Sequence, residues 1–153
     1  MTRNPEGKIK VPKSIANQSN QLSWRLENLE ATISVGSNLI RQFPEIKILL
    51  LQGPLGAGKT SLVTGIAKSL GIEEEISSPT FALAQHYLKG NKPLFHLDLY
   101  RLEDPRSANE LFLQEEELVE SIEGIMIIEW PERLSISLPE AWKGTLNYAH
   151  NNE

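Results

Sequence analysis

The chain has 153 residues, of which 40% are hydrophobic and 23% are charged. This length and composition are typical of one folded domain and exclude separate catalytic and lid domains. No apolar run approaches the ~20 residues that a membrane-spanning helix requires, and residues 1–21 lack the apolar core of a secretory signal. The absence of cysteine excludes disulfides, thiolate zinc sites and cysteine nucleophiles. Together these features predict a cytoplasmic protein.

The net charge of −5 is unevenly distributed. Residues 1–21 carry four basic and one acidic side chains, so their net charge of +3 leaves −8 on residues 22–153. A protein that neutralises nucleic-acid phosphates by itself normally has a basic face. We therefore expect any link to nucleic acid to run through a partner protein.

The first elements are predicted from simple patterns. Residues 1–21 are polar and aperiodic, which predicts a flexible N-terminal arm before a single domain over residues 22–153. Apolar and polar residues alternate over 22–26, which predicts a short strand. Apolar residues then recur at helical spacing over 29–43, and Pro44 ends this predicted helix.

The remaining elements alternate between strands and helices. In order, we expect a buried strand at 46–51, a helix at 59–70 ended by Gly71, two hairpin strands at 81–88 and 94–100, a helix that Asp104 caps and Gly124 ends, a buried strand at 125–128 and a last strand at 144–148. This order of elements is typical of an α/β fold.

A phosphate-binding motif is the sharpest local signal in the sequence. Residues 53–60 read GPLGAGKT, which matches the Walker A pattern G-x-x-x-x-G-K-[ST]. Glycines allow backbone N–H groups to surround phosphate oxygens, and the helix that begins at Lys59 directs its positive end toward the same anion. We expect Lys59 to reach the β- and γ-phosphates and the Thr60 hydroxyl to bind Mg²⁺. The alternative reading is a glycine-rich turn with an incidental lysine.

A P-loop site also needs a carboxylate at the end of a neighbouring buried strand. Glu129 directly follows the apolar run 125–128, and its spacing fits this role well. Asp98 is a second candidate, because alternation places His96, Asp98 and Tyr100 on one face of a strand. The alternative for Asp98 is a solvent-facing acid paired with a nearby basic side chain. His96 is expected to be a hydrogen-bonded structural histidine, since no second histidine stands at metal-ligand spacing.

Four sequence blocks in this order resemble the bacterial tRNA threonylcarbamoyladenosine biosynthesis ATPase family, TsaE (also called YjeE). They are GPLGAGKT at 53–60, SPTF at 78–81, HLDLYRL at 96–102 and IEWPE at 128–132. The family usually has an acid where this chain has Pro54. The resemblance implies a P-loop NTPase-like three-layer sandwich with a mostly parallel central sheet and a short antiparallel hairpin.

The resemblance also implies a set of nucleotide-binding residues. Thr32 is expected near the adenine, and Trp130 is expected either as a wall of the active site or as part of the core. The loop residues expected to hold ATP are Gly53, Leu55, Gly56, Ala57, Gly58, Lys59, Thr60 and Ser61.

The implied catalytic residues are Lys59, Asp98, Glu129 and Thr80. Thr60 and Glu129 would ligate Mg²⁺, directly or through water. Thr80 would sense the γ-phosphate from a switch-like loop, and Asp98 would be needed for hydrolysis.

The function implied by the resemblance is Mg²⁺-dependent ATP hydrolysis within the machinery that forms N6-threonylcarbamoyladenosine at position 37 of tRNAs reading codons that begin with adenine. The chain would be weakly active alone and would not itself be the transferase. Its expected partners are a TsaD-like transferase and a TsaB-like scaffold protein, with tRNA reached only through the complex. A strip such as Leu111, Phe112, Glu115 and Glu116 could dock a basic partner surface, although helix packing explains its two apolar members equally well.

Two other functions fit a P-loop. One is a small kinase that phosphorylates a metabolite. Such kinases use several arginines and a lid, whereas only Arg101, Arg106 and Arg133 follow the motif here. The other is a nucleotide-sensing regulatory switch with negligible turnover.

Overall fold

The structure, a computed structural model, describes residues 5–10, 21–25, 28–54, 57–79 and 82–148. These ranges contain one seven-stranded sheet with the strand order β2-β1-β7-β3-β6-β5-β4. The strands are β1 (Pro5–Lys10), β2 (Gln21–Arg25), β3 (Ile48–Gln52), β4 (Ala84–Tyr87), β5 (Leu94–Asp98), β6 (Ile125–Glu129) and β7 (Trp142–Tyr148). The helices are α1 (Leu29–Gln42), α2 (Lys59–Ser69) and α3 (Pro105–Ser121), with a single 3₁₀ turn η1 (Pro131–Arg133).

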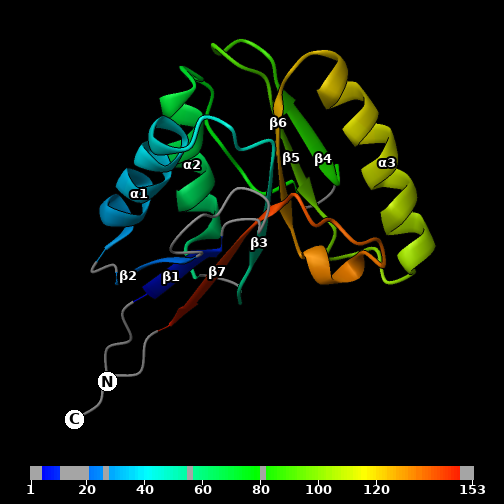
Figure 1. Ribbon diagram of the computed structural model, residues 1–153, viewed down its shortest axis with the longest axis horizontal. Coiled ribbons are helices and arrows are strands. Elements are labelled where there is room, and N and C mark those ends of the chain that lie inside the picture. The colour runs from blue at the N-terminus through cyan, green and yellow to red at the C-terminus, as the bar shows by residue number, and fades with distance from the viewer. Residues whose placement is uncertain (1–4, 11–20, 26–27, 55–56, 80–81, 149–153) are drawn as a thin grey trace.

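The fold has three layers, as the sequence predicts. Helices α1 and α2 cover one face of the sheet and α3 covers the other (Figure 1). Strands β7, β3, β6 and β5 run parallel, while β4 is antiparallel to β5. All five residues of β6 are buried, which is the expected state of a parallel strand covered on both faces. The predicted α/β sandwich with a parallel centre and an antiparallel hairpin is confirmed.

The prediction of a flexible arm is wrong for residues 5–10 and for Gln21. Residues 5–10 form β1, which pairs antiparallel with both β2 and β7, and Gln21 is the first residue of β2. Ile9 is fully buried in the core under α1 and α2. The strand has only this one buried large apolar side chain between two lysines, so its local pattern is weak, and the hydrogen bonds from two neighbouring strands compensate. Residues 1–4 and 11–20 of the predicted arm lie outside the described residues.

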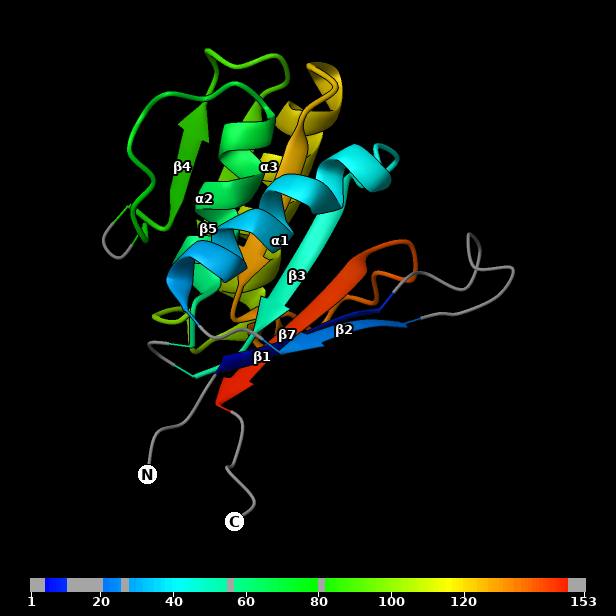
Figure 2. The same cartoon turned by 90° about the vertical axis from the view of Figure 1, so that its left-hand side faces the viewer.

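Helices α1 and α2 lie side by side (Figure 2), and their backbones come into direct contact. A Cβ atom added to Gly65 of α2 would lie 2.0 Å from the carbonyl oxygen of Ile33 in α1. Only glycine permits this approach. The contact fixes α2, whose first residue follows the loop directly.

The ends of the helices follow the predicted signals. Asp104 caps α3 by accepting a hydrogen bond from the backbone N–H of Arg106 at 2.9 Å, and Pro105 is the first helical residue. Gly71 follows the end of α2 with a φ of +75°. The predicted strand at 46–51 forms as Ile48–Gln52, and the last strand begins earlier than predicted, at Trp142. No helix in the described part of the chain is long and apolar enough to cross a membrane.

Candidate nucleotide-binding site

The phosphate loop connects the carboxyl end of β3 to the first residue of α2. Gly58 caps α2 in the left-handed conformation with φ +101° and ψ 14°, which a side chain would strain. Ala57 is buried, and Thr60 and Ser61 are half-buried in the first turn of the helix. Leu55 and Gly56 lie outside the described residues, so their predicted contacts with phosphate stay predictions.

The carboxyl ends of three parallel strands meet beside this loop. Leu51 of β3 pairs in register with Glu129 of β6, and Glu129 pairs with Asp98 of β5. Gln52 then leads from β3 into the loop. Ligands of open α/β sheets bind at this edge, and the two predicted carboxylates lie on neighbouring strands there.

Lys59 joins two of the sequence blocks. Its side chain is almost fully buried, and Nζ donates a hydrogen bond to the carbonyl oxygen of Gly53 at 2.6 Å. The same nitrogen lies 3.9 Å from Oε1 of Glu129 and 4.8 Å from the centre of the Trp130 ring. A buried ammonium group requires such polar partners. The structure therefore brings Gly53 and Lys59 of the first sequence block together with Glu129 and Trp130 of the fourth.

His96 makes a buried contact with Glu129 that the sequence did not reveal. Nε2 of His96 lies 2.6 Å from Oε2 of Glu129, and the two side chains are 0% and 5% exposed. His96 pairs in register with Ile127, so it and Glu129 point to the same face of the sheet. The predicted hydrogen-bonded histidine is present. Its partner was missed, because nothing in the sequence fixes β5 and β6 as neighbours.

Asp98 links β5 to the segment that precedes the predicted switch loop. Its Oδ2 accepts a hydrogen bond from the Ser78 hydroxyl at 3.1 Å, and its Oδ1 accepts one from the backbone N–H of Tyr100 at 3.0 Å. Asp98 is half-buried, and both of these hydrogen bonds lie at the surface. Its predicted role in hydrolysis stays a prediction. Thr80 lies outside the described residues, and its predicted role stays a prediction. Nothing in the sequence indicates the contact of Ser78 with Asp98, because the two residues are 20 positions apart.

Trp130 adopts an unusual backbone conformation directly after Glu129. Its φ of +60° and ψ of +50° are left-handed, which is rare for a bulky residue and is often found at functional sites. The ring is half-buried and tilts against the Tyr100 ring with the centres 4.8 Å apart. Arg133 lies over the Tyr100 ring at 5.8 Å from its centre. The Trp130 ring thus contacts both the ammonium group of Lys59 and the Tyr100 ring, and it also packs against the core on the α3 side. Its predicted place in the wall of the active site stays a prediction.

Thr32 lies beneath the phosphate loop. It is fully buried in α1, and a Cβ atom added to Gly58 would be 3.5 Å from its methyl group. Its hydroxyl donates to the carbonyl oxygen of Asn28 at 3.5 Å. Thr32 therefore supports the backbone of the loop, and its predicted position near an adenine stays a prediction.

The donor groups of the site suit Mg²⁺ together with a phosphate ligand. Among the described residues, no group of three or more His, Cys, Asp or Glu side chains is placed to hold a metal ion. Mg²⁺ is commonly bound through one or two carboxylates and phosphate oxygens, with water completing the octahedron. The Glu129 carboxylate and the Thr60 hydroxyl are oxygen donors of this kind, and the N-terminus of α2 suits the phosphates.

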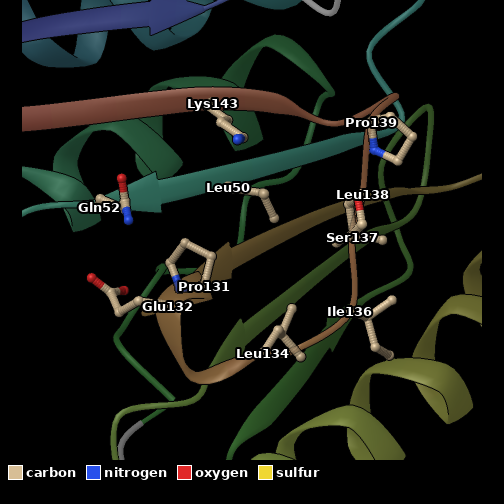
Figure 3. A pocket seen from close by; sticks show the side chains of 10 residues that line it. All are labelled: Leu50, Gln52, Pro131, Glu132, Leu134, Ile136, Ser137, Leu138, Pro139 and Lys143. Atoms are coloured by element: carbon tan, nitrogen blue, oxygen red, sulfur yellow. The ribbon is translucent and has the colours of Figure 1, made fainter.

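A separate cavity of about 260 Å³ lies on the face of the sheet that α3 covers (Figure 3). Leu50 of β3, which lines it, belongs to the core on the α3 side. The cavity contains none of the predicted site residues. Its lining is Leu50, Gln52, Pro131, Glu132, Leu134, Ile136, Ser137, Leu138, Pro139 and Lys143.

Comparison with known proteins identifies the family. A family profile described as "Threonylcarbamoyl adenosine biosynthesis protein TsaE" matches residues 26–153. The tRNA threonylcarbamoyladenosine biosynthesis protein TsaE of Synechocystis is 46% identical over 118 residues, which are 75% of this chain and 73% of the relative. The protein of the same name from Bacillus subtilis is 36% identical over 120 residues, 78% of this chain and 73% of the relative.

A solved structure agrees with these sequence matches. The crystal structure of Bacillus subtilis YdiB has a TM-score of 0.62 and 28% sequence identity, and the match covers 89% of this chain and 82% of that one. The resemblance carried by the four motif blocks is confirmed. The chain therefore belongs to the TsaE family of tRNA threonylcarbamoyladenosine biosynthesis proteins.

Proposed function

We propose that the chain is a Mg²⁺-dependent ATPase of the cytoplasmic machinery that forms N6-threonylcarbamoyladenosine at position 37 of tRNAs reading codons that begin with adenine. The observation that carries this proposal is the position of Lys59 Nζ, 2.6 Å from the Gly53 carbonyl oxygen and 3.9 Å from Glu129, in a member of the TsaE family. A P-loop lysine beside a strand-end carboxylate is the arrangement that phosphoryl transfer uses.

Each residue of the site has a distinct part in this proposal. When bound, Mg²⁺ would neutralise part of the negative charge of the ATP phosphates. Lys59 and the N-terminus of α2 would bind these phosphates, and Thr60 and Glu129 would hold the metal ion. Asp98 orients the attacking water. Its hydrogen bond to Ser78 connects the hydrolytic site to the loop that contains Thr80.

The proposed partners are a TsaD-like transferase and a TsaB-like scaffold protein. The net charge of −8 on residues 22–153 opposes direct contact with tRNA, so the proposal places tRNA on the complex. The chain supplies ATP hydrolysis and does not carry the carbamoyl group.

The direct test is ATP hydrolysis by the full chain, measured with and without the two candidate partners. We expect Asp98→Ala and Glu129→Ala to slow hydrolysis by about 10²–10³-fold, because each carboxylate acts where charge moves in the transition state. ATP affinity should change far less. Normal hydrolysis by both variants in the presence of partners would contradict the site assignment.

A nucleotide-sensing switch is a second candidate, and the Ser78–Asp98 hydrogen bond favours it. In that case the partners would bind in a nucleotide-dependent way while hydrolysis remained negligible in the complete complex. Free phosphate released by the complex decides between the two functions. A phosphorylated metabolite formed in place of free phosphate would support the kinase alternative.

A further inference from the structure

The Glu129 carboxylate has two oxygens in different surroundings. Oε2 lies 2.6 Å from Nε2 of His96, inside the protein, while Oε1 lies 3.9 Å from Nζ of Lys59. A direct bond between an ammonium group and a carboxylate is shorter, ~2.7–2.9 Å. Glu129 is thus hydrogen-bonded to His96 but is too far from Lys59 for a direct hydrogen bond.

The proton of His96 is assigned from its surroundings. Nδ1 of His96 is buried and has no hydrogen-bond partner among the described residues. An unpartnered N–H in the interior is rare, so the proton belongs on Nε2, which then donates to Oε2 of Glu129. The bond fixes the last torsion of the glutamate, which otherwise has a broad, two-fold preference.

We infer that His96 is a positioning residue that holds Glu129 ready to bind a metal ion and keeps it from pairing closely with Lys59. The inference rests on the proposed function, in which Glu129 is a ligand of Mg²⁺. Without the histidine, the carboxylate would rotate toward the buried ammonium group. The lysine and the glutamate would then neutralise each other, and both would be less available to Mg²⁺–ATP.

A second histidine–glutamate pair provides a matched control. Nε2 of His86 in β4 lies 2.5 Å from Oε2 of Glu115 in α3. The His86 ring also stacks on the Phe95 ring, with the ring centres 3.8 Å apart. Neither His86 nor Glu115 contacts the residues around Lys59 in any described interaction. Loss of this pair should change stability without changing metal binding.

The test compares two amides of different length at position 96. The amide nitrogen introduced by His96→Gln reaches about as far as Nε2, whereas that of His96→Asn does not. The readout is the affinity of Mn²⁺, a paramagnetic substitute for Mg²⁺, for the complex of the chain with a non-hydrolysable ATP analogue, measured by electron paramagnetic resonance. We expect His96→Asn to weaken Mn²⁺ binding about 10–100-fold, as is usual when the partner of a metal ligand is removed. His96→Gln should stay close to the parent chain, and so should His86→Asn.

His96→Leu, which also lacks the donor, replaces His96→Asn if that variant does not fold. Unchanged Mn²⁺ affinity in a folded variant without the donor would overturn the inference. The double variant His96→Asn/Glu129→Gln gives a second check. If its loss of Mn²⁺ affinity equals the sum of the two single losses, His96 does not act through Glu129 and the inference is overturned. If the parent chain binds the analogue but Glu129→Gln does not weaken Mn²⁺ binding, the metal role in the proposed function fails together with the inference. If the parent chain does not bind the analogue, the proposed function itself fails.

Discussion

At the residue scale, the surroundings of Lys59 explain how its buried ammonium group is stabilised without a ligand. The ammonium group donates to the Gly53 carbonyl at 2.6 Å and lies 4.8 Å from the centre of the Trp130 ring. Buried charges are stable only with partners of this kind. Because these partners are a peptide dipole and a π face, the lysine can exchange them for phosphate oxygens without separating a close ion pair.

Glu116 offers a test of the electrostatics of α3. Burial raises the pKa of its carboxyl group, and the nearby Glu120 carboxylate raises this pKa further. The folded chain therefore holds the proton more tightly than the unfolded chain, so the free energy of unfolding falls as the pH rises through the raised pKa. We expect Glu116→Gln to raise the melting temperature at pH 7. This gain in melting temperature should disappear below about pH 4, because Glu116 is then protonated in both the folded and the unfolded parent chain.

The exposed neighbour Glu117 on the same helix supplies the control. Glu117→Gln removes one negative charge from α3 without removing a partly buried one. Thermal melts of the parent chain and both variants between pH 4 and pH 8 check the prediction. A Glu116→Gln advantage that is independent of pH would show that the ionised carboxylate is not its cause.

Many residues of the candidate site could be predicted from local sequence patterns alone. Residues 53–60 are contiguous in sequence, and Glu129 directly follows a buried strand, so neither required knowledge of the fold. The contact of His96 with Glu129 was not predictable in this way. It depends on β5 lying beside β6, which is set by packing of the whole sheet. Thr32 shows the same limit, since its burial beneath Gly58 follows from how α1 packs against the loop.

At the scale of elements, the sheet is extended by a strand whose own sequence hardly favours it. β1 obtains hydrogen bonds from β7 on one side and β2 on the other. Its one large apolar side chain in the core is Ile9. Pattern analysis finds strands that bury a continuous or alternating apolar face, such as β3 and β6, and overlooks a strand stabilised mainly by its neighbours.

Substitution of Ile9 tests whether residues 5–10 belong to the folded unit. We expect Ile9→Ala to lower the free energy of unfolding by about 2–5 kcal/mol, the usual cost of truncating a fully buried isoleucine. Lys8→Ala, at the exposed neighbouring position, should have little effect. Urea denaturation of the three proteins measures the difference. Equal stability of the parent chain and Ile9→Ala would mean that this segment is a detached arm after all.

At the scale of the whole molecule, charge and burial limit how partners can bind. The acidic balance of residues 22–153 opposes a polyanion. The predicted docking strip on α3 is wrong in part, because Phe112 is buried in the core and Glu115 is buried against His86. Helical spacing alone had left open which face of α3 meets the sheet. The exposed large apolar residues of that helix are Leu113 and Leu118, and Ile122, which caps its carboxyl end, is also exposed.

This charge balance leads to a prediction about tRNA. The isolated chain should bind tRNA weakly or not at all at physiological salt. In pull-downs, the chain should associate with the TsaD-like and TsaB-like partners in a way that depends on nucleotide. Fluorescence anisotropy with labelled tRNA and pull-downs with and without ATP measure the two quantities. Tight tRNA binding by the chain alone, or no association with either partner under any nucleotide condition, would contradict this account.

The central claim is that Lys59 and its neighbours bind ATP, and one calorimetric titration tests it most directly. ATP with Mg²⁺ is titrated into the parent chain, into Lys59→Ala and into Lys68→Ala, which removes an exposed lysine from the same helix. We predict that the parent chain and Lys68→Ala bind ATP alike, and that folded Lys59→Ala loses most of its affinity, because the charge beside the β- and γ-phosphates is gone. Unchanged ATP affinity in a folded Lys59→Ala protein would contradict the claim.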